Sequence, residues 1–155
     1  VMGRTSGAIA LHTAVAAGAS GVLVPEAHEE LASIVERLKA SIQRGKRSHI
    51  IVVAEGEEAG GAFGVAGAVG KLIDRPFRVV VLGHVQRGGR PTVRDRLVAS
   101  WTAAGAVEAL LAGRSGMMVG MQGGQPVEVP LREVVERSHP EPDLDLLRLA
   151  QQLAG

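Results

Sequence analysis

The chain has 155 residues, a length that suits one ordinary domain and is short for two. Its composition, 46% hydrophobic and 21% charged with a net charge of +1, excludes a disordered chain and provides no overall charge that would favour nucleic acid or a membrane surface. The absence of cysteine excludes disulfides, thiol catalysis and cysteine zinc sites. The 21 glycines are about twice the usual frequency and predict turns and close backbone approaches.

Residues at helical spacing alternate with short apolar runs through the first half of the chain, which predicts helices between buried strands. In chain order, the expected elements are a helix within 5–19, a strand at 22–26, a helix at 28–44, a strand at 49–56, a helix at about 62–73 and a strand at 77–84.

In the second half, Pro91 suits the entry to a long helix at 92–112, and Gly123-Gly124 predicts the turn of a hairpin within 117–131. Two short helices are expected at 131–138 and 142–153. Because strands alternate with helices, we predict an α/β fold with three layers: a mainly parallel sheet with helices on both faces.

Polar residues follow the predicted strands at their carboxyl ends, where open parallel sheets bind ligands. Arg4 precedes the first helix, Glu26 and Glu55 close two strands, and His84 closes a third and is followed by Arg87. Arginine suits phosphate and glutamate suits sugar hydroxyls, so this edge favours a phosphorylated small molecule that carries hydroxyl groups.

Each of these residues also has a plain structural interpretation. A single arginine is usually a solvated surface residue, a histidine at a strand end is usually structural, and Glu55 could cap the next helix. Asp95 and Arg96 predict a salt bridge on a helix. The sequence contains neither a P-loop nor a dinucleotide-binding glycine fingerprint.

Four segments carry a resemblance to a known family: Met2-Gly3-Arg4, Val24-Pro25-Glu26, AEG at 54–56 and LGHVQRGGRPTVRDRLVAS at 82–100. They resemble the C-terminal half of bacterial ATP-dependent 6-phosphofructokinase, in order and with matching spacing. The resemblance implies transfer of the γ-phosphoryl group of ATP to the 1-hydroxyl of fructose 6-phosphate in glycolysis. The family binds ATP and Mg²⁺ through its N-terminal half, so we expect no metal site in this chain and no activity from it alone.

The resemblance implies a phosphofructokinase-like fold that is incomplete here. Residues 1–85 would form part of the sugar-phosphate-binding domain, 86–130 would belong to the nucleotide-binding domain, and 131–155 would return to the first. The start at Val1 likewise favours a piece of a longer protein. No segment reads as a signal peptide or a membrane span, and the expected location is the cytoplasm.

The resemblance assigns a substrate role to several residues. Met2, Gly3 and Arg4 match a segment that contacts fructose 6-phosphate, and Arg4 would also stabilise charge on the transferred phosphoryl group. Glu55 matches a glutamate that accepts hydrogen bonds from the sugar hydroxyls.

The sugar phosphate would be bound by His84 and Arg87, and by Arg78 from a neighbouring subunit. In an unbroken strand, Arg78 and His84 would lie roughly 20 Å apart, too far to hold one phosphate within one chain. This spacing favours a homo-oligomer, and the resemblance implies a tetramer.

The resemblance also implies an effector site for ADP or phosphoenolpyruvate, made by Gly18, Ser20, Arg44, Lys46 and Arg47. Without it, the basic residues would simply complement a helix C-terminus. Ser20 stands where the family often has an acidic residue associated with the magnesium of ADP, so ADP activation is in doubt. His49, beside this loop, is interpreted as a strand-start residue.

Two other functions stay open on the sequence alone. One is a pyrophosphate-dependent phosphofructokinase, because the choice of phosphoryl donor is made in the other half of the family's chain. The other is a non-catalytic module that senses a sugar phosphate or a nucleotide.

Overall fold

The structure, a computed structural model, describes residues 1–27, 30–56, 60–136 and 143–154. The chain divides into two compact units: unit 1 comprises Val1–Arg87 and Glu141–Gly155, and unit 2 comprises Gly88–Pro140. The predicted starts of two helices, at 28 and 142, and the predicted end of a third, at 138, lie outside the described residues. No helix within the described ranges is both long and apolar enough to cross a membrane.

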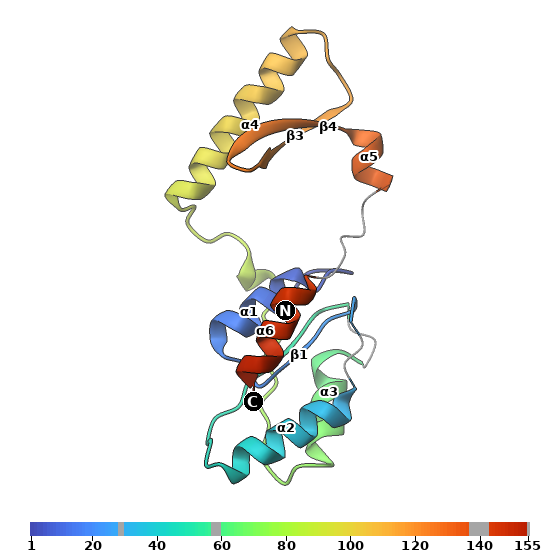
Figure 1. The fold of residues 1–155 in the computed structure, drawn as a ribbon, viewed down its shortest axis with the longest axis vertical. Helices are drawn as coiled ribbons and strands as arrows, with labels where there is room; N and C mark the ends of the chain where they lie inside the picture. Colours follow the sequence, from blue (N-terminus) through green and yellow to red (C-terminus); the bar gives the residue numbers. More distant parts are fainter. Residues whose placement is uncertain (28–29, 57–59, 137–142, 155) are drawn as a thin grey trace. The chain divides into compact units, whose positions relative to one another are not determined.

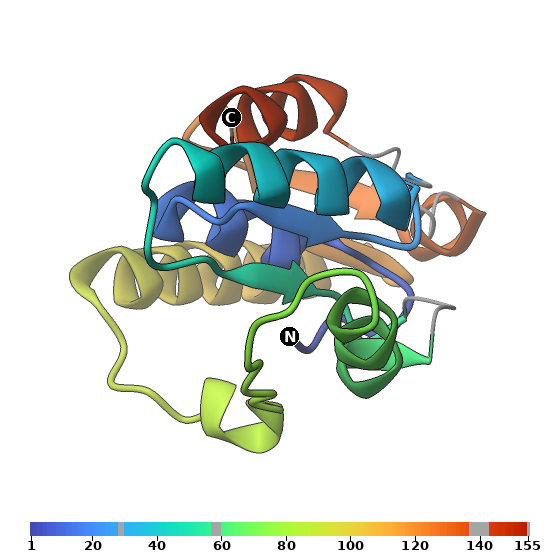
Figure 2. The same ribbon diagram turned by 90° about the horizontal axis from the view of Figure 1, so that it is seen from below.

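Unit 1 is a three-layer α/β arrangement around two parallel strands (Figure 1). Figure 2 shows its two strands side by side. The pairing joins Gly21 with Ile51 and Leu23 with Val53. The elements of unit 1 are α1 (Ala8–Ala17), β1 (Gly21–Leu23), α2 (Leu31–Gln43), β2 (Ile51–Val53), α3 (Gly61–Gly70), the 3₁₀ helix η1 (Gly83–Gln86) and α6 (Leu144–Ala154).

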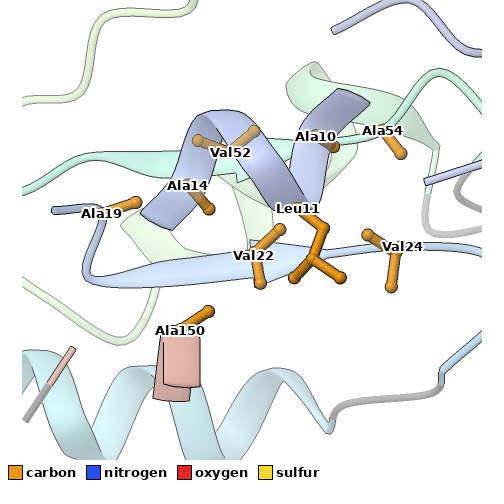
Figure 3. Close-up of a cluster of buried hydrophobic side chains, with 9 residues drawn as sticks. All are labelled: Ala10, Leu11, Ala14, Ala19, Val22, Val24, Val52, Ala54 and Ala150. Atoms are coloured by element: carbon orange, nitrogen blue, oxygen red, sulfur yellow. The ribbon is translucent and has the colours of Figure 1, made fainter. Parts of the chain in front are cut away.

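Alternate residues of the strand segments point to opposite faces of this small sheet, as β geometry requires. On one face, Val22 and Val52 pack with Leu11 of α1 and Ala150 of α6 in a core of small and branched side chains (Figure 3). The members of this core are Ala10, Leu11, Ala14, Ala19, Val22, Val24, Val52, Ala54 and Ala150. The small residues let helix and sheet approach closely, so the near absence of aromatic residues is compatible with a dense interior.

On the opposite face, Leu23 and Val53 pack against α2 and α3. Ile34 of α2 and Val69 of α3 have no exposed surface at all. Helices therefore cover both faces of a parallel sheet, and the predicted three-layer α/β class is confirmed.

Unit 2 is built from one long helix and a hairpin, with the elements α4 (Val93–Leu111), β3 (Met117–Gln122), β4 (Gln125–Pro130) and α5 (Leu131–Glu136) (Figure 1). The predicted hairpin is confirmed: β3 and β4 are antiparallel, and Gly123 and Gly124 both have positive φ, at 58° and 81°. Such two-residue turns follow the twist of the strands and favour glycine.

The start of α4 is fixed by a capping box rather than by the predicted salt bridge. The Asp95 carboxylate accepts hydrogen bonds from the Thr92 backbone N–H and hydroxyl, both at 2.7 Å, and the Thr92 hydroxyl accepts from the Asp95 N–H at 3.3 Å. The expected Asp95–Arg96 pair was therefore wrong, because the carboxylate turns back to the free amides of the first turn.

The predicted buried strand at 77–84 is also wrong. The structure assigns no strand to this segment, and Val80 and Val81 are 71% and 65% exposed. At its end the chain turns into η1. An apolar run becomes a strand only where a neighbouring backbone accepts and donates its hydrogen bonds, and β1 and β2 pair only with each other among the described residues.

Candidate functional site

The candidate site lies where the chain leaves the carboxyl end of β2. The Val1 ammonium group donates to the Val53 carbonyl at 2.8 Å, and the Glu55 N–H donates to the Val1 carbonyl at 2.8 Å. Val1 therefore lies alongside the end of β2, in the pattern of a parallel ladder. This placement brings the Met2–Arg4 turn to the sheet edge at which α/β proteins bind ligands.

Glu55 holds that turn through its side chain. Its Oε2 atom accepts hydrogen bonds from the backbone N–H groups of Gly3 and Arg4, both at 3.1 Å. These two bonds, from Arg4 and then Gly3, are the largest causes that lower the pKa of the Glu55 carboxyl, and the positive charges of the N-terminus and Arg87 add to the effect. Glu55 is thus a charged acceptor, and its Oε1 accepts no hydrogen bond within the described part of the chain.

Two glycines allow the backbone segments of this turn to approach each other. A Cβ on Gly56 would overlap the Arg4 carbonyl oxygen, and a Cβ on Gly3 would overlap the Ser6 carbonyl oxygen. Arg4 itself has a φ of 53°, in the left-handed region that side chains other than glycine rarely adopt. The surrounding contacts impose this strained backbone on Arg4, as is common at functional sites.

The segment with His84 and Arg87 reaches the same turn through Gln86. The Gln86 Oε1 atom accepts a hydrogen bond from the Met2 N–H at 2.8 Å, across 84 residues of sequence. His84 lies two residues earlier on η1, and the Arg87 N–H donates to the His84 carbonyl at 3.0 Å. The structure therefore brings together the predicted residues of the Met2–Arg4 turn, Glu55 and the His84–Arg87 segment.

Two other predicted edge residues are not part of this arrangement. Glu26 accepts two hydrogen bonds from the Gly7 N–H, at 2.7 and 2.9 Å, so it occupies the N-terminus of α1 instead of facing a ligand. Arg78 lies in the exposed segment before η1. Since that segment is not a strand, the roughly 20 Å spacing of an unbroken strand cannot be taken over for it, and the shared site stays a prediction.

A second polar cluster forms around the buried residue Ser20. Its hydroxyl accepts from the Lys46 Nζ at 3.2 Å and lies 3.2 Å from the Nδ1 atom of His49. The His49 ring also contacts the Ser41 hydroxyl at 3.4 Å and the Lys46 carbonyl at 3.2 Å. His49 is therefore a central member of this cluster, and its interpretation as a mere strand-start residue was too narrow.

The other residues predicted for the effector site lie at the ends of α1 and α2 or in the loop that follows α2. Gly18 ends α1 with a φ of 59°, two residues before Ser20. Arg44 is the C-cap residue of α2, and the side chain of Arg47 is exposed. The contacts thus join Ser20 and Lys46 directly.

The side chains of the first cluster have the chemistry to bind an anion and hydroxyl groups. Arg4, His84 and Arg87 present exposed cationic or hydrogen-bonding heads, and Glu55 presents a carboxylate oxygen. Within the described ranges, no group of three histidine or acidic side chains could hold a metal ion.

Sequence reasoning missed two residues of these clusters. Gln86 stands between His84 and Arg87, and its place in the QRGG motif was the available signal. His49 follows the basic loop directly, but its approach to Ser20, 29 residues away, depends on the pairing of β1 with β2.

Comparison with known proteins identifies the family of the chain. A family model described as phosphofructokinase matches residues 1–110. The chain is 49% identical over 154 residues to ATP-dependent 6-phosphofructokinase 1 of Thermus thermophilus, covering 99% of this chain and 48% of the relative. It is 45% identical over 154 residues to the ATP-dependent 6-phosphofructokinase of Brevibacillus brevis, covering 99% of this chain and 47% of that protein.

Solved structures give the same result. Phosphofructokinase from Pichia pastoris in the T-state superimposes with a TM-score of 0.80 at 28% identity, over 99% of this chain and 19% of that one. Phosphofructokinase from Saccharomyces cerevisiae gives 0.81 at 27% identity, over 99% of this chain and 22% of that one. The chain spans about half the length of the bacterial relatives that it matches. By its family model, its close relatives and its fold, the chain belongs to the phosphofructokinase family.

Proposed function

We propose that this chain supplies the fructose 6-phosphate site of an ATP-dependent 6-phosphofructokinase. The reaction transfers the γ-phosphoryl group of ATP to the 1-hydroxyl of the sugar and gives fructose 1,6-bisphosphate. The observation that carries the proposal is the pair of long-range contacts at the Met2–Arg4 turn. Glu55 holds the amides of Gly3 and Arg4, and Gln86 holds the amide of Met2.

Each side chain of the cluster has a role that its chemistry suits. His84 and Arg87 bind the 6-phosphate, because an imidazole and a guanidinium donate hydrogen bonds to phosphate oxygens. Glu55 accepts a hydrogen bond from a sugar hydroxyl through Oε1, while Oε2 holds the turn. Arg4 stabilises the charge on the transferred phosphoryl group, with Met2 and Gly3 lining the sugar.

The proposal also includes ATP, Mg²⁺ and a residue from a neighbouring subunit. ATP and its Mg²⁺ bind through the part of the enzyme that this chain does not span, and Mg²⁺ supplies charge neutralisation of the phosphates when bound. Arg78 reaches the 6-phosphate of a neighbouring subunit in a homotetramer. By full-length enzyme we mean these 155 residues together with the part of a phosphofructokinase chain that they do not span.

The effector site belongs to the proposal too. Phosphoenolpyruvate or ADP binds at Gly18, Ser20, Arg44, Lys46 and Arg47, and makes the enzyme allosteric. The bond from Lys46 to the buried Ser20 hydroxyl supports this assignment, because it fixes a cation beside the end of α2. Such an enzyme acts in glycolysis in the cytoplasm.

The sharpest test is the Arg87→Ala substitution in the full-length enzyme. Loss of one charge-assisted contact to phosphate should raise the KM for fructose 6-phosphate roughly 10- to 100-fold, because such bonds are worth about 1.5–3 kcal/mol. The KM for ATP should change little. Arg75→Ala removes another exposed arginine of unit 1 and serves as the matched control. An unchanged KM for fructose 6-phosphate in Arg87→Ala would refute the proposed site.

A further inference from the structure

We infer that Gln86 is a positioning residue that fixes the phosphate-binding segment relative to the sugar-binding turn. The inference rests on the proposed function, and it concerns a residue that the site roles above leave out. Gln86 contacts the Met2 N–H and needs no contact with the substrate to act.

Three consecutive backbone amides of the Met2–Arg4 turn are held by side chains from two distant segments. The Met2 amide donates to Gln86 at 2.8 Å, and the Gly3 and Arg4 amides donate to Glu55 at 3.1 Å each. The turn forms no regular secondary structure that would satisfy these amides by itself. Its conformation, including the left-handed backbone of Arg4, therefore depends on both side-chain acceptors.

Packing does not hold η1 in place. None of its residues is buried, and the side chain of Val85, its apolar member, is 79% exposed. Its backbone bonds are local: the Val85 N–H donates to Leu82, and the Arg87 N–H donates to His84. Across the described part of unit 1, the Met2–Gln86 bond is the hydrogen bond that ties η1 to a distant segment.

The bond therefore joins the two halves of one ligand site. On one side are His84 and Arg87, which bind the phosphate in the proposed function. On the other side is the turn with Arg4, which Glu55 anchors to the end of β2. A sugar phosphate must meet both sets at once, so the distance between them must be fixed before binding for tight association. Gln86 fixes it by one neutral hydrogen bond.

The test compares Gln86→Leu with Gln86→Glu in the full-length enzyme. Leucine removes the acceptor, whereas glutamate keeps an oxygen acceptor for the Met2 N–H. A neutral hydrogen bond contributes about 1 kcal/mol, so Gln86→Leu should raise the KM for fructose 6-phosphate about 5- to 10-fold, with the KM for ATP and kcat within about twofold of wild type. Gln86→Glu should recover most of the loss. Gln151→Leu changes another exposed glutamine of unit 1 and is the control.

Each outcome separates this inference from the proposed function. If Arg87→Ala raises the KM for fructose 6-phosphate and Gln86→Leu does not, the role of Gln86 is overturned and the site stands. If Arg87→Ala has no effect, the proposed function fails first. A parallel rise in the KM for ATP in Gln86→Leu would also overturn a positioning role.

A measurement on the unaltered enzyme covers the case in which Gln86→Leu does not fold. Hydrogen exchange of the Met2 amide should be at least about tenfold slower than in an unstructured chain, because Gln86 accepts its hydrogen. Exchange at the unstructured rate would overturn the inference without any variant.

Discussion

Unit 1 and unit 2 are held together in different ways. Unit 1 contains two clusters of buried side chains, one on each face of its sheet, and its polar contacts join residues up to 84 positions apart. In unit 2, α4 buries one residue, Ala109, and the Arg114–Glu128 ion pair spans 14 positions. A core fixes the relative places of distant segments, whereas local contacts fix only neighbours. The residues that we propose to act together on one small ligand accordingly lie in unit 1.

The largest expected effect is the difference between substitution of a buried side chain of unit 1 and of an exposed apolar side chain of unit 2. Ile34→Ala in unit 1 removes a fully buried side chain and should lower the free energy of unfolding by about 2–5 kcal/mol. Leu111→Ala at the end of α4 removes a side chain that is 84% exposed and should change it by less than about 0.5 kcal/mol. Urea denaturation of the 155-residue chain, followed by circular dichroism, measures both.

The two variants should also differ in where the structure loosens. Hydrogen exchange in Ile34→Ala should increase in β1 and β2 and stay unchanged in the β3–β4 hairpin, since the units are separate compact bodies. A loss of stability in Leu111→Ala as large as that in Ile34→Ala would show that the contrast between the units is wrong.

The fold of both units could be read largely from the sequence because local signals and packing agree there. Alternating helical and strand patterns predicted the layers, and the paired glycines at 123 and 124 predicted the hairpin turn. The prediction of a strand at 77–84 was wrong for a physical reason. Its apolar residues are a strand signal, but strand formation requires a hydrogen-bonding neighbour, and hydrophobicity alone does not specify one.

The candidate site likewise has residues that could be placed from the sequence and contacts that could not. Glu55 could be placed at the carboxyl end of a strand from the sequence. The placement of His84 and Arg87 beside it rested on a strand at 77–84 that does not form, and the Gln86–Met2 bond joins their segment to the turn instead. Two contacts of the site join residues that are distant in the sequence: Gln86 with Met2, 84 residues apart, and His49 with Ser20, 29 residues apart. A local sequence pattern cannot predict such contacts.

A second prediction contrasts two glycines of unit 1 that differ in their surroundings. Gly56→Ala places a Cβ against the Arg4 carbonyl and should lower stability by about 1–3 kcal/mol while displacing the Met2–Arg4 turn. Gly67→Ala, inside α3 with open space around its Cβ, should raise stability by about 0.5–1 kcal/mol. Thermal unfolding of the two variants side by side is the measurement. A neutral Gly56→Ala would mean that the turn does not need this close approach.

The smallest expected effect concerns two carboxylates, one in each unit. Hydrogen bonds lower the pKa of Glu55 below its ordinary 4.5 and that of Asp95 below its ordinary 3.8. For a carboxyl whose pKa is lower in the folded chain, the stabilisation is complete above the ordinary value and disappears as the pH falls through the lowered one. Both sets of hydrogen bonds should therefore be intact at pH 7 and break in acid. The two carboxylates should differ in how distant in sequence the affected residues are.

Protonation of Glu55 weakens its bonds to the amides of Gly3 and Arg4, which are 52 and 51 positions away, so this part of the turn should loosen while Val1 stays bonded to the end of β2. Protonation of Asp95 should only loosen the first turn of α4, since its partner Thr92 is three residues away. Amide chemical shifts followed by NMR from pH 7 to pH 3 should show the Gly3 and Arg4 signals moving together below about pH 4.5. In Glu55→Gln these two signals should not titrate, whereas the α4 signals should behave as in the wild type. Titration of Gly3 and Arg4 in Glu55→Gln would show that another group controls the turn.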